Sequence, residues 1–200
     1  MSIPREPPSA KLIAGLLFND FAVRDQALET LFRRYGPFDF LSEPQHFTHT
    51  TYYNREMGPN ILRQVCSFLN LVRPEDLPDV KLYTNQLETH LSQDGKRRVN
   101  IDPGLLSEER LILATGKNYT HRVYLRSGIY ADLTLVFQNG AYRALPWTYP
   151  DYQEPTLLHF LGILRQKLII QRRGRLATNH QREQEVSFDL QHDRIRSESS

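Results

Sequence analysis

Residues 11–18 constrain the fold more than any other part of the chain. They read Lys-Leu-Ile-Ala-Gly-Leu-Leu-Phe, a near-continuous apolar run of strand length. Such a run is typical of a strand that is buried on both faces of its sheet. We therefore expect a central strand with other elements packed against both sides, and Gly15 within it indicates a close approach of another group to the backbone.

Amphipathic segments elsewhere in the chain predict the helices that cover this sheet. Apolar residues at helical spacing predict one helix that starts near Asp25 and is ended by Gly36-Pro37, and a second over residues 77–91. Pro155 opens a last helix with a leucine stripe from Leu157 to Leu168. Ser107 as a candidate cap predicts a further short helix over residues 107–114.

The remaining patterned segments predict an antiparallel sheet. The expected strands lie at residues 38–53 (with a break near 42–44), 61–72, 97–101, 121–125, 129–137 and 141–145. Asn139-Gly140 is a strong short-hairpin signal between the last two. The first elements follow the order β-α-β-β-α-β of ferredoxin-like domains. The predicted fold class is α+β: a ferredoxin-like βαββαβ unit extended by a three-stranded antiparallel meander and a C-terminal helix.

Composition and segment character predict the domain organisation. The chain has 200 residues and a formal net charge of +2, which is too small to indicate a nucleic-acid or membrane partner. We expect a flexible leader at residues 1–9, a single α+β domain at residues 10–172 and a disordered charged tail at residues 173–200. The leader has three prolines, and the tail has few apolar residues.

The single cysteine and the lack of apolar leader or spanning sequences restrict the class of protein. Cys66 is the only cysteine, so the chain can form no intrachain disulfide and no thiolate metal cluster. It lies in an apolar run and is expected to be a buried, unreactive thiol. No secretory h-region and no run of about 18 apolar residues occurs. These features predict a cytoplasmic protein.

The segment at residues 100–152 is the predicted site, because it concentrates turn-forming, basic and aromatic residues. The candidate ligand-binding residues are Asn100, Asp102, Lys117, His121, Arg122, Trp147, Tyr149 and Asp151. A lysine and an arginine with an imidazole suit a phosphate or carboxylate, and the aromatic loop suits a flat ring. Successive strand residues point to opposite faces, so at most one of His121 and Arg122 is expected to join Lys117. We expect Asp102, Lys117 and Trp147 to meet at one end of the sheet.

Several short motifs resemble those of a bacterial family of unknown function that is seen largely in deltaproteobacteria. The motifs are Lys-Leu-Ile-x-Gly-Leu-Leu (11–17), Tyr-Tyr-x-x-Glu-Met-Gly (52–58), Thr-Asn-x-x-Glu (84–88), Asn-Ile-Asp-Pro-Gly (100–104), His-Arg-x-Tyr-Leu (121–125), Gly-Ile-Tyr-Ala (128–131) and Pro-Trp-Thr-Tyr-Pro-Asp-Tyr (146–152). The resemblance covers about residues 10–172. It implies no reaction, although members are sometimes labelled GTP-binding.

That GTP-binding label finds little support in these residues. A P-loop requires Gly, four residues, Gly-Lys and then Ser or Thr. Gly116-Lys117 is present, but Leu111 and Asn118 occupy the other required positions. The sequence therefore does not predict a P-loop GTPase.

Other functional interpretations compete with structural ones. His46-Phe47-Thr48 is similar to the His-x-Thr element of two-histidine phosphoesterases, but a second such element is missing. Four acids lie near turns and have no diagnostic metal-ligand spacing; they are Glu56, Glu88, Asp102 and Asp151. No metal site is predicted, and a metal bound by two of these acids with His46 or His49 is kept as a minor alternative. Structural alternatives are a turn at Asp102, a helix cap at Asp151 and surface charge at Lys117.

Five basic residues without an intervening acid lie in and just after the second half of the last predicted helix; they are Arg165, Lys167, Arg172, Arg173 and Arg175. A solvated helix end explains this run better than a nucleic-acid surface. Taken together, we predict a protein that binds a small anionic, phosphate-bearing ligand such as a nucleotide, with no cofactor identified. The alternatives are a non-enzymatic interaction protein and, less favoured, a phosphoesterase or RNA-processing enzyme.

Overall fold

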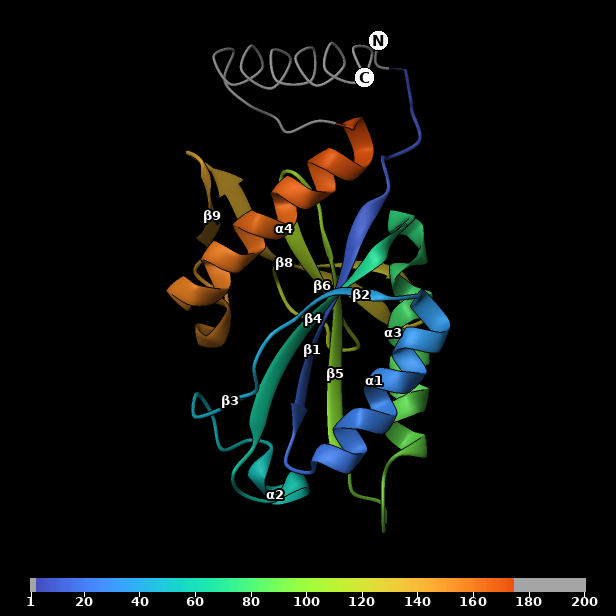
Figure 1. Cartoon of the computed structure of the whole chain (residues 1–200), viewed down its shortest axis with the longest axis vertical. Helices are drawn as coiled ribbons and strands as arrows, with labels where there is room; N and C mark the ends of the chain where they lie inside the picture. Colours follow the sequence, from blue (N-terminus) through green and yellow to red (C-terminus); the bar gives the residue numbers. More distant parts are fainter. Residues whose placement is uncertain (1–2, 175–200) are drawn as a thin grey trace, which may run out of the picture.

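The computed structural model describes residues 3–174 and is built around one large sheet (Figure 1). Its strands are β1 (Ala10–Phe18), β2 (Phe38–Leu41), β3 (Gln45–His46), β4 (Leu62–Val72), β5 (Val99–Leu106), β6 (Arg110–Thr115), β7 (Arg122–Arg126), β8 (Ile129–Gln138) and β9 (Ala141–Ala144). The helices are α1 (Phe21–Tyr35), α2 (Asn54–Met57), α3 (Leu77–His90) and α4 (Pro155–Arg173), with 3₁₀ turns η1 (Pro74–Asp76) and η2 (Pro150–Tyr152). The strand order is β2-β4-β1-β5-β6-β8-β7, with β3 added to β4 and β9 to β8.

Strand β1 is the central, two-sided strand that the apolar run predicted. It pairs antiparallel with β4 and with β5, and all nine of its residues are buried. Leu12 and Leu16 join a core with residues of α1 and α3, whereas Ile13 joins a second core with Leu161 of α4. Figure 1 shows the corresponding layers, with α1 and α3 side by side and α4 apart from them.

The three long helices are confirmed, although α1 begins earlier than predicted. Asp20 caps α1, since its carboxylate accepts a hydrogen bond from the backbone N–H of Ala22 at 2.8 Å. Gly36, at a φ of 92°, ends it. Helix α3 covers residues 77–90, and α4 starts at Pro155 as expected. The short helix α2 was not anticipated.

The coarse fold class is confirmed: α+β, with a large antiparallel sheet and a C-terminal helix. The ferredoxin-like unit stays a prediction. The three strands of the predicted meander, β7, β8 and β9, are present, but β7 and β9 do not lie on opposite edges of β8. Strand β6 occupies one edge of β8 along residues 130–136, so β7 and β9 pair with different halves of the other edge.

The helix predicted over residues 107–114 is wrong, because this segment is a tight turn followed by strand β6. The hydroxyl of Ser107 accepts hydrogen bonds from the backbone N–H groups of Glu109 and Arg110, both at 3.3 Å. A helix cap makes the same kind of contact. Leu111 and Leu113 are buried on strand β6, where residues two apart share a face.

Gly104 of β5 lies close against β6, and its substitution gives a first prediction. A Cβ atom at this position would lie 2.7 Å from the backbone oxygen of Ile112 and 2.7 Å from a methyl carbon of Leu113. We expect Gly104→Ala to lower the free energy of unfolding by about 1–3 kcal/mol in urea denaturation, as overpacking does.

Gly162→Ala is the matched control for that substitution. It lies in α4, and its added Cβ would have no neighbour within 4 Å. Replacing a helical glycine here is expected to raise stability by about 0.5–1 kcal/mol. If both variants changed stability in the same direction, the close approach at Gly104 would not be the cause.

The two predicted flanking segments are described only in part. Residues 3–9 have no helix or strand, and Arg172 donates a hydrogen bond from Nε to the backbone oxygen of Ser9 at 2.7 Å. Of the predicted tail, all but residues 173 and 174 lies outside the described residues. None of the described helices is both long and apolar enough to cross a membrane.

Candidate functional site

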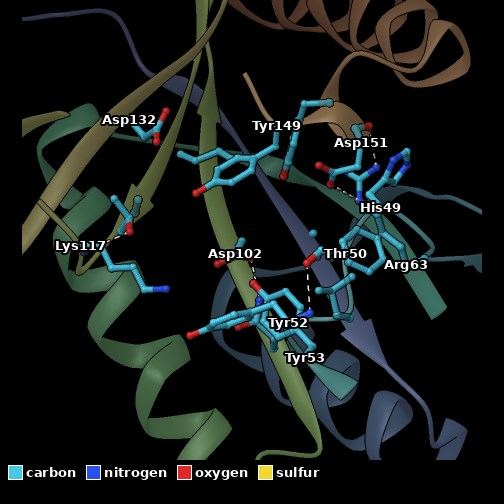
Figure 2. A pocket seen from close by; sticks show the side chains of 18 of the residues that line it. His49, Thr50, Tyr52, Tyr53, Arg63, Asp102, Lys117, Asp132, Tyr149 and Asp151 are labelled. Atoms are coloured by element: carbon cyan, nitrogen blue, oxygen red, sulfur yellow. Dashed lines mark hydrogen bonds and ion pairs between the residues drawn. The ribbon is translucent and has the colours of Figure 1, made fainter. Parts of the chain in front are cut away.

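A pocket of about 690 Å³ opens over β1, β5 and β6, and we refer to it as the central pocket (Figure 2). Its remaining walls come from the loop after β3, strand β4, helix α3, the segment after β6, strands β7 and β8, and η2. The residues that line it are Gly15, Leu17, Phe47, His49, Thr50, Tyr52, Tyr53, Arg63, Lys81, Asn85, Glu88, Arg97, Asn100, Asp102, Leu113, Ala114, Thr115, Gly116, Lys117, Arg122, Asp132, Tyr149, Pro150, Asp151 and Tyr152.

Six of the eight predicted site residues line the central pocket. They are Asn100, Asp102, Lys117, Arg122, Tyr149 and Asp151. Asn100 and Asp102 lie on β5, where Asp102 pairs with Gly15 of β1, so Asp102 does not form the turn considered as its structural alternative. Asp102 and Lys117 therefore share one cavity.

The other two predicted residues, His121 and Trp147, are not among the pocket-lining residues. Their rings stack on each other at a centroid distance of 4.9 Å and an interplanar angle of 12°. The indole N–H of Trp147 donates to the backbone oxygen of Leu133 at 2.7 Å. The expected meeting of Trp147 with Lys117 and Asp102 is therefore wrong. Arg122 lines the pocket and His121 does not. Their side chains nevertheless do not point to opposite faces, because His121 precedes β7 and both contact Oδ2 of Asp132, at 3.3 and 2.8 Å.

The floor of the pocket is a network of charged side chains from α3 and β5. Lys81 donates from Nζ to the backbone oxygen of Ile101 at 2.8 Å and to Oδ1 of Asp102 at 3.3 Å. Asn100 donates from Nδ2 to Oδ2 of the same carboxylate at 2.7 Å. The carboxylate of Asp102 thus accepts one hydrogen bond at each oxygen from these two side chains.

Glu88 and Arg97 extend this network. Oε1 of Glu88 accepts the backbone N–H of Ile101 at 2.7 Å, and Arg97 donates from Nη1 to Oδ1 of Asn100 at 2.7 Å. Burial raises the pKa of the Glu88 carboxyl, although Lys81 opposes that rise. These contacts fix the floor of the pocket in one arrangement.

Arg122 fixes the wall formed by β7, β8 and the aromatic loop. Its guanidinium donates from Nε to Oδ2 of Asp132 at 2.8 Å, from Nη1 to the backbone oxygen of Lys117 at 3.0 Å, and from Nη2 to the hydroxyl of Tyr149 at 2.9 Å. Arg122 thereby holds the backbone that carries Lys117. Its own charge is already neutralised by Asp132.

Arg63 and Asp151 form the wall near η2. Nε of Arg63 lies 3.1 Å from Oδ2 of Asp151, and the guanidinium stacks over the ring of Tyr152. Burial raises the pKa of the Asp151 carboxyl, and the charge of Arg63 opposes this. Asp151 therefore pairs with Arg63 of β4. It is not the cap of α4 that was considered as its structural alternative, because the N-cap position of α4 is Glu154.

Lys117 differs from the other cations of the pocket. Five basic side chains line the pocket against four carboxylates, and Arg63, Lys81, Arg97 and Arg122 each contact a carboxylate. Within residues 3–174, Lys117 has no carboxylate partner; its Nζ lies 4.9 Å from the centroid of the Tyr52 ring. Figure 2 shows Lys117 extending into the pocket. The unpaired positive charge of the pocket is thus at Lys117.

Comparison with known protein families identifies the family of this chain. Residues 8–168 match the family described as Domain of unknown function (DUF4416). The chain belongs to this family. No curated protein and no solved structure matches the chain.

The DUF4416 domain has pocket residues that sequence reasoning missed. The most important are Arg63, Lys81, Arg97 and Tyr53. His49, which was considered only as a possible metal ligand, also lines the pocket and contacts Glu154 at 2.7 Å. Some signal existed, because the motifs at residues 52–58 and 84–88 contain Tyr52, Tyr53, Asn85 and Glu88. Spatial proximity of these motifs to residues 100–152 could not be deduced from one sequence.

The DUF4416 domain shows neither a P-loop nor a metal centre in the part of the chain that is described. Gly116-Lys117 lies between strands β6 and β7, where no helix begins. No three His, Cys, Asp or Glu side chains in residues 3–174 gather so that they could hold a metal ion. His46 is exposed on β3 and does not line the central pocket.

The basic run on α4 of the DUF4416 domain is largely engaged within the domain. Arg172 and Arg173 contact the carboxylate of Glu108 at 3.1 and 2.8 Å, and Arg165 donates to the backbone oxygen of Glu108 at 2.7 Å. Lys167 donates to the backbone oxygen of Asp39 at 2.8 Å. Arg175 lies outside the described residues. The described part of the run thus anchors α4.

The ion pair between Glu56 and Arg97 ties α2 to the floor of the pocket and gives a pH-dependent prediction. Arg97 donates from Nε to Oε1 at 2.9 Å and from Nη2 to Oε2 at 2.7 Å. These hydrogen bonds hold the pKa of the Glu56 carboxyl below its ordinary value. The resulting stabilisation is present above the ordinary pKa and is lost as pH falls through the depressed pKa.

Glu56→Gln is therefore expected to lower stability at about pH 7 and to have a smaller effect near about pH 3. The loss at neutral pH should not exceed about 1 kcal/mol, since the pair is partly exposed to solvent. Urea denaturation at both pH values measures the difference. An equal loss at the two pH values would show that the ion pair is not its source.

Proposed function

We propose that this protein binds a small anionic, phosphate-bearing ligand, such as a sugar phosphate or a nucleotide, in the central pocket. The observation that carries the proposal is Lys117, a cation without a carboxylate partner in a pocket whose other cations are paired. A phosphate there would supply the missing negative charge. The paired groups around it form a polar frame that already exists before a ligand binds.

Aromatic side chains support a ligand that also carries a flat or apolar part. Phe47, Tyr52, Tyr53 and Tyr149 line the same cavity. Rings of this kind pack against sugar or base faces, and pockets for small molecules combine such surfaces with a few polar groups. The cavity volume of about 690 Å³ lies within the range of such pockets.

A thermal-shift screen tests the proposal with inorganic phosphate, sugar phosphates and nucleotides as probes. A ligand at about a hundredfold its dissociation constant adds roughly 2.7 kcal/mol to apparent stability. We expect Lys117→Ala to weaken binding of any positive probe by about 1.5–3 kcal/mol, because a charge-assisted hydrogen bond is lost. Isothermal titration then gives the affinities of both proteins.

Lys96→Ala is the matched control, since Lys96 is exposed in a turn and does not line the pocket. Neither substitution is expected to alter unfolding without ligand by more than about 0.5 kcal/mol. Equal loss of affinity in both variants would assign the effect to net charge. No shift with any probe would refute anion binding.

An interaction protein is the second candidate, because the edge strand β7 exposes apolar side chains. Val123 is 68% and Tyr124 57% exposed. Edge strands with such side chains are favoured sites for the addition of another chain. The ligand-binding function is preferred because the pocket brings together side chains from segments spread along the chain between residues 15 and 152.

We also retain the ferredoxin-like interpretation of β1, α1, β2, β4, α3 and β5 as a proposal. Their order along the chain and the antiparallel arrangement β2-β4-β1-β5 support it. A phosphoesterase or RNA-processing activity remains the weaker alternative, since His46 lies outside the pocket-lining set.

A further inference from the structure

The carboxylate of Asp102 is oriented as an acceptor toward the central pocket. Lys81 and Asn100 each contact a different oxygen of it, at 3.3 and 2.7 Å. The side chain is nevertheless 39% exposed, and Asp102 lines the cavity. A carboxylate has about four acceptor positions, so each oxygen can accept one more hydrogen bond from the pocket side.

The charges around Asp102 favour neutral donors over a second cation. Lys81 is already 3.3 Å from Oδ1, and the pocket has one more basic than acidic lining residue, five against four. An ammonium or guanidinium on the ligand would lie beside Lys81 and be repelled by it. Hydroxyl groups can donate to both oxygens without that repulsion. Two neighbouring hydroxyls match the two oxygens of one carboxylate.

The surroundings of Asp102 suit the ring that would carry such hydroxyls. Tyr53 lines the same pocket; burial, and to a lesser degree the charge of Asp102, raises the pKa of its hydroxyl. This hydroxyl is therefore a protonated donor at neutral pH. Asn85, one turn along α3 from Lys81, also lines the cavity and offers an amide. Aromatic and amide groups beside a carboxylate are typical of sugar recognition.

We propose that the anionic ligand of the central pocket is a ribose-type sugar phosphate, free or as part of a nucleotide, whose vicinal diol donates to Asp102 while its phosphate contacts Lys117. This inference rests on the proposed function. It adds a second recognition element on the opposite side of the ligand from the phosphate. Carboxylates bind ribose hydroxyls in the same way in dinucleotide-binding folds.

Isothermal titration with ribose 5-phosphate and 2-deoxyribose 5-phosphate tests the inference on the unaltered chain. The deoxy sugar lacks one hydroxyl of the diol, and we expect it to bind about 10- to 100-fold more weakly, as for one hydrogen bond to a charged group. AMP and 2′-deoxy-AMP should show the same ratio if the sugar is recognised within a nucleotide. Tighter binding of AMP than of ribose 5-phosphate would identify the nucleotide as the preferred form.

Asp102→Asn provides the matched variant, because the side chain keeps its size but one acceptor becomes a donor. Its unfolding curve shows whether it is folded, and inorganic phosphate should bind it as it binds the unaltered chain. We expect the preference for the ribose over the deoxyribose compound to disappear in Asp102→Asn. A preference that persists in this variant would overturn the role of Asp102.

The outcomes separate this inference from the proposed function. Equal binding of the ribose and deoxyribose compounds, with both weakened by Lys117→Ala, would overturn the diol inference and leave the anion site standing. Failure of every phosphate compound and of inorganic phosphate to bind would overturn both. Ribose-selective binding that is lost separately in Asp102→Asn and Lys117→Ala would support both.

Discussion

Asp39→Ala is expected to lower the free energy of unfolding by about 3–5 kcal/mol, the usual cost of leaving a buried charge without its partner. Lys11 is fully buried, at 0% exposure, and its Nζ contacts Oδ2 of Asp39 at 2.7 Å. Its other hydrogen bond is to the backbone oxygen of Phe68 at 3.0 Å. Burial already lowers the pKa of Lys11, and Asp39 opposes that change.

The effect should be large because contacts of the pair join four elements of the fold. Lys11 lies on the central strand β1 and Asp39 on β2, and Ser67 of β4 also donates to the Asp39 carboxylate. Lys167 of α4 donates to the backbone oxygen of Asp39 at 2.8 Å. Equilibrium denaturation in urea measures the loss.

The double variant Lys11→Met/Asp39→Ala separates the unpaired charge from lost packing. Replacing a buried pair with apolar groups is often nearly neutral, so we expect the double variant to recover much of the stability that Asp39→Ala loses. A double variant as unstable as Asp39→Ala would contradict this explanation. A loss below about 1 kcal/mol in Asp39→Ala would contradict the importance of the pair itself.

Arg122→Ala is expected to have the second large effect, a loss of about 3–5 kcal/mol together with weaker ligand binding. Arg122 is buried and hydrogen-bonded to Asp132, to the backbone of Lys117 and to Tyr149. Without it, the buried Asp132 carboxylate retains only His121 and Thr134 as contacts among the described residues, both at 3.3 Å. The loop that carries Lys117 also loses its anchor.

Arg126→Ala is the control on the same strand. Arg126 forms an ion pair with Asp79, with a shortest distance of 2.6 Å, but both side chains are exposed. Exposed pairs are screened by water and contribute little. Urea denaturation and phosphate titration should therefore show a much smaller change for Arg126→Ala. Equal destabilisation by the two arginine substitutions would show that burial of the Arg122 contacts does not matter.

The elements that could be predicted from sequence are those whose local pattern and final environment agree. The apolar run of β1 is buried on both faces, and Asn139-Gly140 adopts the positive φ angles, 51° and 80°, that a tight hairpin requires. The helix predicted at Ser107 was wrong because the local pattern there does not determine the final structure. The Ser107 hydroxyl makes the same backbone contacts at a turn as at a helix start, so only the pairing of β5 with β6 decides between them.

The candidate site could be predicted only where its residues lie close in sequence. Asn100, Asp102 and Lys117 fall on or beside consecutive strands β5 and β6, so their motifs indicated one region. In the sequence, Lys81 looks like a solvent-exposed helix residue and Arg63 like a polar strand residue. Only the fold shows that Lys81 contacts β5 and that Arg63 contacts η2. Such contacts across about 20 to 90 residues cannot be read from periodicity, which reports only the local face of an element.

A crystal structure of the protein with the tightest-binding phosphate compound from the screen tests the central claim most directly. We expect the phosphate within hydrogen-bonding distance of Lys117 Nζ, inside the central pocket that Asp102, Arg122 and Tyr149 line. The same compound, at the same concentration, should occupy the cavity less fully in crystals of Lys117→Ala. A phosphate bound instead at the basic side chains of α4, with the central pocket unchanged, would contradict the account.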